Sequence, residues 1–343
     1  MKHTQHLSFV HSHKNRIKSL VCAQQLSRSS IEHLINLAEF IRSSGSDINI
    51  MKHLKTILAT KSCILFFPQC STRTFSSFSL AAQTLGMIVE EIRDPQFSAI
   101  NKGESEIDCL IALGTLSDLI IIRHINTSFV YSVLDEFFSR GIETHIINAG
   151  NGSDQHPTQA MLDFYTISAH FDILTSNEEL SVAFVGDLKR SRAVRSLSYI
   201  LSLYPQITQI FVAPSELQIE HDILTHLKEN SIQTFCTDSL DTVLSEADVF
   251  YMGRIQDEYG ETSQEIRQEY CKYHLTTDKV NLMKPKACIL HGLPRRTELP
   301  AEIDRDLRAK YWEAVSRGKQ IRIALLLYLF GYDDIRQLQQ CVP

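Results

Sequence analysis

Short apolar runs alternate with longer stretches of helical spacing along most of this chain, and this alternation constrains the fold more than any other feature. The runs have the length and composition of buried strands, and the amphipathic stretches between them are long enough for crossover helices. Strands separated by helices favour a parallel sheet, because the chain must return to the same end of the sheet after each strand. The predicted strands are residues 63–67, 87–92, 119–122, 144–147, 182–185, 210–212, 248–252 and 287–290.

The chain is long enough for two such α/β halves. Its 343 residues exceed what one compact core usually holds. Gly150, Asn151 and Gly152 interrupt the pattern between the fourth and the fifth predicted strand. A strongly apolar helix is expected from about Gly318 to Phe330. We therefore predict two α/β halves with a break near residue 150.

Local signals mark the ends of several predicted elements. Ser29 and Glu32 have the spacing of a capping box, which predicts a helix that begins there. Gly86 is expected to end another helix, because glycine adopts the left-handed conformation that closes many helices. Residues 1–18 are polar and unpatterned, so we expect a loose extension without the apolar segment of a secretory signal.

Composition argues against several classes of protein. The net charge of −6 gives no electrostatic footprint for nucleic acid or an acidic membrane. No apolar stretch is long enough to span a bilayer. None of the eight cysteines forms a CxxC pair or lies near histidines at zinc spacing. We therefore expect reduced, buried thiols, no metal, and a cytoplasmic location.

A run of hydroxyl residues around an arginine follows the first predicted strand. Ser71, Thr72, Arg73 and Thr74 lie between residues 63–67 and a helical pattern. The start of a helix directs N–H groups and the positive end of its dipole at an anion, and a guanidinium fork matches phosphate oxygens. Taken alone, the run would more often be an ordinary helix cap with two spare hydroxyls. Its assignment to phosphate depends on the motifs that follow.

Three further motifs follow in order along the chain. They are Ser98 with Lys102-Gly103-Glu104, Ile122-Arg123-His124, and His156-Pro157-Thr158-Gln159. Alone, Lys102 would be a solvated loop lysine, Arg123 a strand-end arginine and His156 a structural histidine. Together with the Ser-Thr-Arg-Thr run, their order resembles the aspartate/ornithine carbamoyltransferase family, and an ordered set is far more specific than any single match.

The resemblance implies a carbamoyltransferase-like fold of two doubly wound parallel-sheet domains. A carbamoyl-phosphate-binding domain would comprise residues 1–155 and 317–343, and an amino-acid-binding domain residues 156–316. The implied catalytic residues are Arg73, Thr74, Lys102, Arg123 and His156. The implied carbamoyl phosphate ligands are Ser71, Thr72, Arg73, Thr74, Ser98, Arg123, His156, Gln159 and Leu293. No cofactor is implied. The family is trimeric, so a homotrimer with shared active sites is expected, in which Ser98 and Lys102 reach a neighbouring subunit's site.

The second half of the chain carries the motifs that distinguish acceptors. Gly186-Asp187-Leu188-Lys189 with Arg192, and Arg254-Ile255-Gln256, resemble the aspartate branch. The segment from His291 to Arg295 also resembles that branch, and the Ser-Met-Gly loop of the ornithine branch is absent. In isolation the first motif reads as a glycine turn into a helix with solvated Lys189, Arg190 and Arg195. The resemblance implies that aspartate binds to Lys102, Arg192, Arg254, Gln256 and Leu293.

Several positions depart from the family pattern. Phe75 stands where arginine is usual and Ser79 where glutamate is usual, and if these two residues form an ion pair in the family, the two losses together nearly cancel. Gly292 replaces a proline, which loosens the loop that presents the Leu293 carbonyl. Pro68-Gln69-Cys70 replaces Phe-Glu-Pro ahead of the Ser-Thr-Arg-Thr run.

The leading hypothesis is transfer of a carbamoyl group from carbamoyl phosphate to L-aspartate in pyrimidine synthesis. Transfer to a different amine, a non-catalytic binding subunit and a plain nucleotide-binding α/β protein remain alternatives. The sequence does not indicate whether a regulatory partner exists.

Overall fold

The computed structural model describes residues 17–93 and 103–340. The predicted loose extension therefore lies almost wholly outside the described residues, as do Ser98 and Lys102. The chain divides into two compact units. Unit 1 comprises Met1–Thr158 and Ser316–Pro343, and unit 2 comprises Gln159–Val315. The sequence places the corresponding domain boundaries at 155/156 and 316/317.

Unit 1 contains a parallel sheet of four strands in the order β2-β1-β3-β4. Its strands are β1 Ser62–Phe66, β2 Ile88–Ile92, β3 Leu119–His124 and β4 His145–Asn151. All four were predicted, and the two central strands, β1 and β3, have the apolar sequence expected of a strand buried on both faces. Upstream of them, Leu20 forms a parallel bridge with Ile147 of β4.

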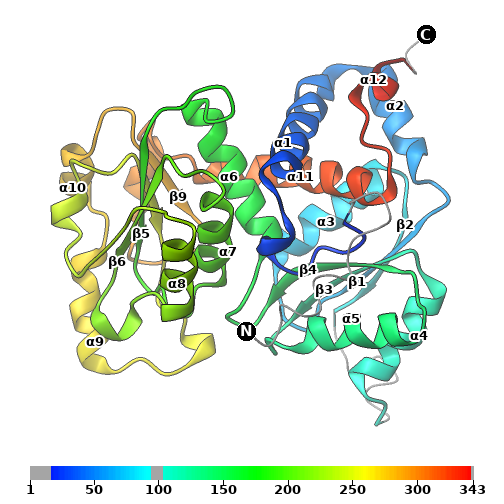
Figure 1. Cartoon of the computed structure of the whole chain (residues 1–343), viewed down its shortest axis with the longest axis horizontal. Helices are drawn as coiled ribbons and strands as arrows, with labels where there is room; N and C mark the ends of the chain where they lie inside the picture. The colour runs from blue at the N-terminus through cyan, green and yellow to red at the C-terminus, as the bar shows by residue number, and fades with distance from the viewer. Residues whose placement is uncertain (1–16, 94–102, 341–343) are drawn as a thin grey trace. The chain divides into compact units, whose positions relative to one another are not determined.

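The helices of unit 1 cover both faces of this sheet, with α3 on one face and α5 on the other (Figure 1). They are α1 Arg28–Ser43, α2 Ile48–Ile57, α3 Thr72–Thr84, α4 Glu106–Leu116, α5 Phe129–Ser139 and α12 Ile335–Gln340. Helices α6 Pro157–Phe171 and α11 Tyr311–Phe330 contain the two points where the chain passes between the units.

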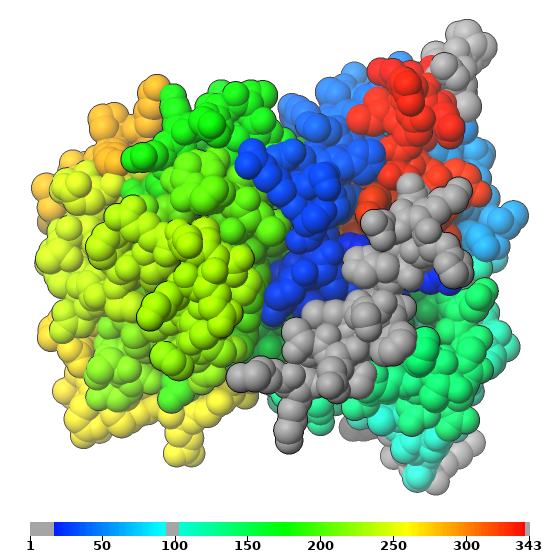
Figure 2. Space-filling model, viewed as in Figure 1, coloured from blue at the N-terminus to red at the C-terminus, as the bar shows by residue number. Residues whose placement is uncertain are grey.

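The two ends of the described chain meet within unit 1. Early and late segments lie side by side on the face seen in Figure 2, coloured blue and red. His33 of α1 forms a 2.8 Å hydrogen bond with Asp333. Arg322 of α11 is buried, donates to Ser77 Oγ at 2.8 Å and lies over the Phe78 ring. Unit 1 is therefore completed by residues from the end of the chain.

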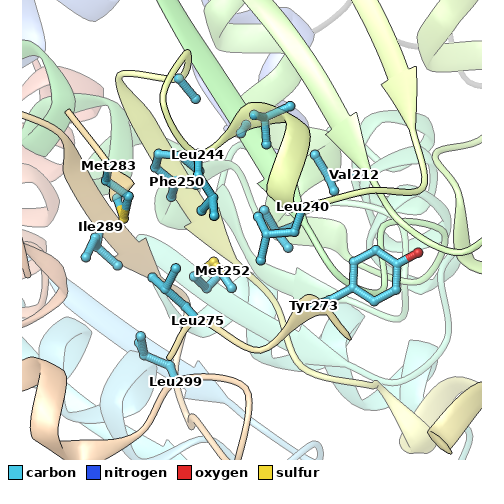
Figure 3. Close-up of a cluster of buried hydrophobic side chains, with 14 of the residues drawn as sticks. Val212, Leu240, Leu244, Phe250, Met252, Tyr273, Leu275, Met283, Ile289 and Leu299 are labelled. Carbon is cyan, nitrogen blue, oxygen red and sulfur yellow. The ribbon is translucent and has the colours of Figure 1, made fainter. Parts of the chain in front are cut away.

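Unit 2 contains a parallel sheet of five strands in the order β7-β6-β5-β8-β9. Its strands are β5 Leu180–Val185, β6 Ile207–Val212, β7 Thr234–Thr237, β8 Val249–Met252 and β9 Cys288–His291. Its helices are α7 Arg192–Leu201, α8 His221–Glu229, α9 Gln264–Glu269 and α10 Thr277–Leu282, followed along the chain by α11. A short 3₁₀ helix, Tyr270–Tyr273, follows α9. Figure 3 shows apolar side chains of one core cluster, which lies against β8 and β9.

Three sequence expectations need correction. Helix α1 begins at Arg28 with Ser27 as its cap, because Ser27 Oγ accepts the Ser30 N–H, so the Ser29/Glu32 capping box is wrong. Helix α11 begins at Tyr311, well before Gly318. Not all thiols are buried, since three cysteines are exposed. These are Cys70, Cys236 and Cys271.

Within the described residues, none of the helices has the length and apolarity needed to cross a bilayer. The same residues contain no group of three or more His, Cys, Asp or Glu side chains that could hold a metal ion.

Candidate functional site

The sequence-predicted residues of unit 1 follow three neighbouring strands. The Ser71–Thr74 turn follows β1, Arg123 is near the end of β3, and His156 follows β4. Because these strands are parallel and adjacent, their carboxyl ends meet at one edge of the sheet, where α/β proteins bind ligands. The backbone N–H of Gln69 donates to the Arg123 carbonyl at 3.4 Å, which ties the turn to β3.

The Ser71–Thr74 turn has the geometry of a helix start. Ser71 is the N-cap of α3 in extended conformation, and the Phe75 N–H makes the first helical bond to its carbonyl at 3.2 Å. The Ser71 side chain makes no capping hydrogen bond, so the ordinary cap interpretation is wrong for this hydroxyl. Thr72 and Arg73 are exposed and Thr74 is buried. The first turn directs its N–H groups out of the helix end beside these side chains.

Arg123 and His156 are held by the backbone around β4. The Arg123 guanidinium donates to the Ala149 carbonyl at 3.1 Å. His156 is 4% exposed and lies directly before α6. The N–H of the neighbouring Gln155 donates to the Asn151 side chain at 3.0 Å, and the Asn151 N–H donates to the Gln155 carbonyl at 3.1 Å. These bonds fix the segment that presents the His156 ring.

A cavity of about 510 Å³ opens at the same edge of unit 1. Its lining comes from the residues before the Ser71–Thr74 turn, the end of β3 and the start of α4, namely Pro68, Gln69, Cys70, Glu106, His124 and Ile125. His124 stacks on Phe129 and forms a 3.1 Å hydrogen bond with Glu106. The residues that line the cavity are neighbours of the sequence-predicted Ser71 and Arg123 and do not include the predicted site residues themselves.

The two departures on α3 are accommodated by new contacts with neighbouring strands. Phe75 is buried, packs edge-on against Phe67 at 5.3 Å and lies under the Arg93 guanidinium. Ser79 donates to Glu91 at 3.4 Å. Aromatic, cation–π and hydrogen-bonding contacts therefore brace this helix where the family pattern has two opposite charges.

In unit 2, Arg192 is the first residue of α7, after the β5 loop that begins with Gly186. It is 8% exposed and lies 5.7 Å from the centroid of the Tyr259 ring. Burial lowers the pKa of the guanidinium, and Arg254 lowers it further, whereas Tyr259 and Glu258 oppose the shift. Arginine remains protonated despite such a shift, so a buried cation is held at this strand end.

Arg254 and Gln256 follow β8, the neighbour of β5 in the sheet. The Arg254 guanidinium makes two hydrogen bonds to the Glu258 carboxylate, one of 2.9 Å, and these bonds raise its pKa. The Gln256 backbone N–H donates to Asp187 at 2.9 Å. Arg192, at the start of the helix after β5, and Arg254 and Gln256, in the loop after β8, thus follow two adjacent strands of unit 2.

Asp187 and Arg190 connect these elements, and sequence reasoning missed their role. Both side chains are buried, and Arg190 Nε donates to Asp187 at 2.8 Å. The Arg190 guanidinium also donates to the Gly260 carbonyl and, at 2.8 Å, to Thr262. The interpretation of Arg190 as a solvated helix-start residue is therefore wrong. The spacing of Asp187 and Arg190 was the only local signal of their pairing.

Gln159 belongs to a buried hydrogen-bonded group on α6 and β8. Its amide nitrogen lies 3.1 Å from both carboxylate oxygens of Asp163, and the Tyr251 hydroxyl donates to Asp163 at 3.0 Å. A carboxylate only accepts, so the Gln159 NH₂ faces Asp163 and its amide oxygen is oriented away as an acceptor. Burial raises the pKa of Tyr251 well above its usual range, which keeps the hydroxyl a donor.

The loop after β9 positions the Leu293 carbonyl. Leu293 has a φ of +47°, and its N–H donates to His291 Nδ1 at 2.7 Å. Nε2 of His291 lies 2.9 Å from Glu298, and burial lowers the pKa of this histidine. A Cβ at Gly292 would come within 3.0 Å of the Tyr251 hydroxyl, so the small residue fits a crowded position.

Comparisons with known proteins identify the family of this chain. The model of the aspartate/ornithine carbamoyltransferase carbamoyl-P binding domain matches residues 18–169, and the model of the Asp/Orn binding domain matches residues 178–329. An aspartate carbamoyltransferase catalytic subunit from Methanocaldococcus jannaschii is 34% identical over 86% of this chain and 93% of its own length. The multifunctional protein CAD from Squalus acanthias is 32% identical over 91% of this chain, which spans only 13% of that larger protein.

A solved structure supports the same assignment. Aspartate transcarbamoylase from Trypanosoma cruzi, in complex with carbamoyl phosphate and aspartate, superposes with a TM-score of 0.80 at 32% identity. The match covers 90% of this chain and 95% of that one. The parallel sheets and the ordered motifs are therefore those of a known family. This chain belongs to the aspartate/ornithine carbamoyltransferase family.

Proposed function

We propose that this protein transfers the carbamoyl group of carbamoyl phosphate to the amino group of L-aspartate, giving N-carbamoyl-L-aspartate and phosphate for pyrimidine synthesis. The observation that carries the acceptor assignment is the pair of guanidinium groups, Arg192 and Arg254, at adjacent strand ends of unit 2. Two cations at one site match the two carboxylates of aspartate. Gln256, fixed by its bond to Asp187, supplies a further polar group there.

Carbamoyl phosphate binds in this proposal at the start of α3. Ser71, Thr72, Arg73 and Thr74 supply hydroxyls, N–H groups and a guanidinium to the phosphate, with Arg123 on the next strand. Thr74, Arg123 and His156 also donate hydrogen bonds to the carbonyl oxygen of carbamoyl phosphate. Gln159 and the Leu293 carbonyl accept from the NH₂ end, which agrees with the outward orientation of the Gln159 amide oxygen.

The chemistry requires no covalent enzyme intermediate. The aspartate amine forms a bond to the carbonyl carbon, negative charge develops on the carbonyl oxygen, and the carbon–oxygen bond to phosphate then breaks. The departing phosphate accepts the proton that the amine loses. Donors preplaced at the oxygen stabilise the transition state, and loss of one such donor typically costs about 3 kcal/mol. Thr74, Arg123 and His156 are the donors we assign to this role.

The charges of unit 2 also predict which amines are excluded. Ornithine would bring a second ammonium group toward Arg192 and Arg254. Like charges that meet in a partly desolvated pocket cost several kcal/mol, which changes the preference by orders of magnitude. Succinate, a dicarboxylate without an amine, should bind and not react.

The test is an assay with radiolabelled carbamoyl phosphate and a panel of amines. We expect labelled carbamoyl aspartate, essentially no product from ornithine, and inhibition by succinate that competes with aspartate. Turnover that favours ornithine or a neutral amine would overturn the aspartate assignment and leave carbamoyl transfer intact. Absence of product from every amine, with carbamoyl phosphate bound, would favour a non-catalytic binding subunit.

We further propose a cytoplasmic homotrimer with shared active sites, to which Ser98 and Lys102 contribute from a neighbouring subunit. Both residues lie outside the described part of the chain. The proposal rests on their match to the family motif. Mixing inactive Lys102→Ala chains with inactive Arg73→Ala chains should restore activity, since a mixed trimer can contain one undamaged site. No restoration, with subunit exchange demonstrated by mass, would place each site within a single chain.

A further inference from the structure

The hydroxyl of Tyr270 lies between the two loops that carry the candidate acceptor residues. Tyr270 is 3% exposed and belongs to the 3₁₀ helix after α9. Its hydroxyl donates to the Gly253 carbonyl at 2.7 Å and accepts the Asp187 backbone N–H at 3.0 Å. Gly253 directly follows β8, and Asp187 lies two residues after β5. One side chain thus joins the ends of two strands.

This junction lies where direct pairing of the two strands stops. Val185 of β5 pairs with Met252 of β8, and the Gly253 N–H still donates to the Val185 carbonyl at 2.8 Å. Beyond that point one loop leads to Arg192 and the other to Arg254 and Gln256. The Tyr270 hydroxyl supplies the next connection between the segments that follow β5 and β8, in place of a direct backbone hydrogen bond.

Glycines stand at the two loop positions beside this junction, Gly186 and Gly253. Gly186 has a φ of +120°, and a Cβ at this position would collide with the Tyr270 hydroxyl. A Cβ at Gly253 would come within 3.2 Å of the Val185 carbonyl. Neither position accommodates a larger side chain without movement. The backbone at Gly186 therefore leaves room for the Tyr270 hydroxyl, and Gly253 allows the close approach of β8 to β5.

A second bond carries the effect of Tyr270 toward the ligand-facing residues. The Asp187 carboxylate accepts the Gln256 N–H at 2.9 Å and the Arg190 guanidinium at 2.8 Å. Asp187 is therefore held by Tyr270 at its backbone and holds Gln256 with its side chain. Burial raises the pKa of Tyr270 well above its usual range, so the hydroxyl keeps the proton that it donates to Gly253.

We propose that Tyr270 is a positioning residue for the acceptor site: its hydroxyl fixes the β5 and β8 loops relative to each other, so that Arg192, Arg254 and Gln256 converge on one amino acid. Tyr270 acts through Asp187 and Gly253 and does not itself contact substrate. This inference rests on the proposed function for its choice of ligand. The junction itself rests on the hydrogen bonds alone.

The same 3₁₀ helix provides a matched control. Tyr273 is buried in the same apolar cluster as Tyr270, and its ring is 5.8 Å from the Tyr270 ring. Its hydroxyl points away from the neighbouring labelled apolar side chains (Figure 3) and donates to the Asp238 carbonyl at 2.8 Å. Asp238 follows β7, the edge strand, and carries none of the candidate acceptor residues. Removing either hydroxyl deletes one buried donor to a backbone carbonyl.

The experiment compares Tyr270→Phe with Tyr273→Phe in the full chain. Both changes should lower the melting temperature, Tyr270→Phe more than Tyr273→Phe, because the Tyr270 hydroxyl makes two hydrogen bonds and the Tyr273 hydroxyl one. We expect Tyr270→Phe to raise the KM for aspartate and the inhibition constant of succinate roughly threefold to tenfold, the range of one net hydrogen bond. The KM for carbamoyl phosphate should stay within about twofold, as should all constants of Tyr273→Phe. Equal effects of both variants on aspartate, or no effect of Tyr270→Phe, would overturn the inference.

A second measurement separates this inference from the proposed function. Hydrogen exchange of the ligand-free protein reports the Asp187 and Gln256 amides directly. Tyr270→Phe should accelerate exchange at both positions, and Tyr273→Phe should leave them unchanged. If the wild-type chain failed to carbamoylate aspartate, the proposed function would fail, yet accelerated exchange would still support the junction. Unchanged exchange in Tyr270→Phe would overturn the junction, whatever the acceptor is.

Discussion

The two halves of the proposed site differ in which atoms they present and in how those atoms are held. In unit 1, the start of α3 presents hydroxyls and N–H groups whose positions follow from the helix itself. In unit 2, the guanidinium groups are those of Arg192 at the start of α7 and Arg254 in the loop after β8, and both contact other side chains. Arg254 is paired with Glu258, and Gln256 is fixed by Asp187, which is itself held by Arg190 and Tyr270.

This difference has a physical cause. A helix start fixes several donors at once through backbone geometry, so a phosphate site there needs few supporting residues. An arginine side chain has many rotamers, and ordering it costs conformational entropy that supporting contacts must offset. We call the start of α3 the phosphate half of the site and the Arg192, Arg254 and Gln256 group the acceptor half. We therefore expect single changes at the phosphate half to act on the ligand directly. Changes around the acceptor half should also act at a distance, through residues that never touch aspartate.

The largest effect is expected at the phosphate half. Arg73→Ala removes the guanidinium from the turn and should lower kcat/KM for carbamoyl phosphate by about 10²- to 10³-fold, the usual cost of losing a group that stabilises developing charge. Steady-state kinetics and calorimetry with carbamoyl phosphate would measure this loss. Arg140→Ala is the control, since Arg140 is exposed and pairs with Glu136 on α5. Undiminished carbamoyl phosphate affinity in folded Arg73→Ala would contradict the assignment.

Arg254 should give the next largest effect. Arg254→Ala should raise the KM for aspartate by about 10- to 100-fold, because a hydrogen bond to a charged group contributes about 1.5–3 kcal/mol. Binding of carbamoyl phosphate should change little. Arg254→Lys keeps the positive charge but loses the two-pronged guanidinium, so its KM for aspartate should lie between those of the wild type and the alanine variant. Arg267→Ala, which removes an exposed arginine paired with Asp257, is the matched control. A KM for aspartate that Arg254→Ala leaves unchanged would be inconsistent with the acceptor site.

Arg190 tests whether the acceptor half depends on its supporting residues. Arg190→Gln leaves the Asp187 carboxylate buried without its cation, and breaking a buried pair of this kind typically costs about 3–5 kcal/mol of stability. The melting temperature should fall, and the KM for aspartate should rise severalfold while that for carbamoyl phosphate is preserved. Arg195→Gln, on the first turn of α7, removes a pair with the half-exposed Asp222 and should have a small effect. Equal KM values in Arg190→Gln and the wild type would mean that the support is dispensable.

The smallest effect concerns the pH dependence of stability. Burial lowers the pKa of His291, so the unfolded chain takes up a proton at higher pH than the folded one. Stability is therefore intact above the usual histidine pKa of about 6.5 and falls as the pH drops below it, by at most about 1.4 kcal/mol per pH unit. His291→Gln should flatten the fall in melting temperature between pH 7.5 and 5, roughly the range where histidine titrates. The pKa values of His145, His226 and His274 are also lowered by burial, and these residues remain in both proteins. An identical slope in both proteins would show that His291 does not titrate in this way.

The strands were predictable where the sequence contains an apolar run, which most of them owe to burial and which the exposed edge strand β2 has at its start. β7 was missed because its residues are half-buried or exposed, so Thr234–Thr237 carries no such run. The start of α1 was misplaced because Ser27, Ser29 and Ser30 all have capping side chains, and only the backbone conformation selects Ser27. The apolar segment of α11 was recognised, whereas its polar first turns from Tyr311 resemble a loop in sequence.

The candidate site residues were predictable only where they belong to a short sequence motif. The Ser-Thr-Arg-Thr run and Arg254-Ile255-Gln256 are local, so sequence order was enough to find them. Tyr270 and Asp187 are 83 positions apart, and no local pattern connects them. Arg190 was interpreted as solvated because its local sequence is that of a polar helix start. Its partner, the Gly260 carbonyl, lies 70 residues further along the chain and has no local signal.

The discontinuity of unit 1 has a consequence for synthesis on the ribosome. Residues 159–315, which form unit 2, are made as one block between the two parts of unit 1. At about 5–20 residues per second, roughly 8 to 30 s separate the completion of the first part from the appearance of Arg322 and Asp333. During this interval α1 and α3 lack the partners that His33, Ser77 and Phe78 contact in the finished protein. Unit 1 therefore acquires its last contacts only after the whole of unit 2 has been made, whereas unit 2 is synthesised as one continuous stretch.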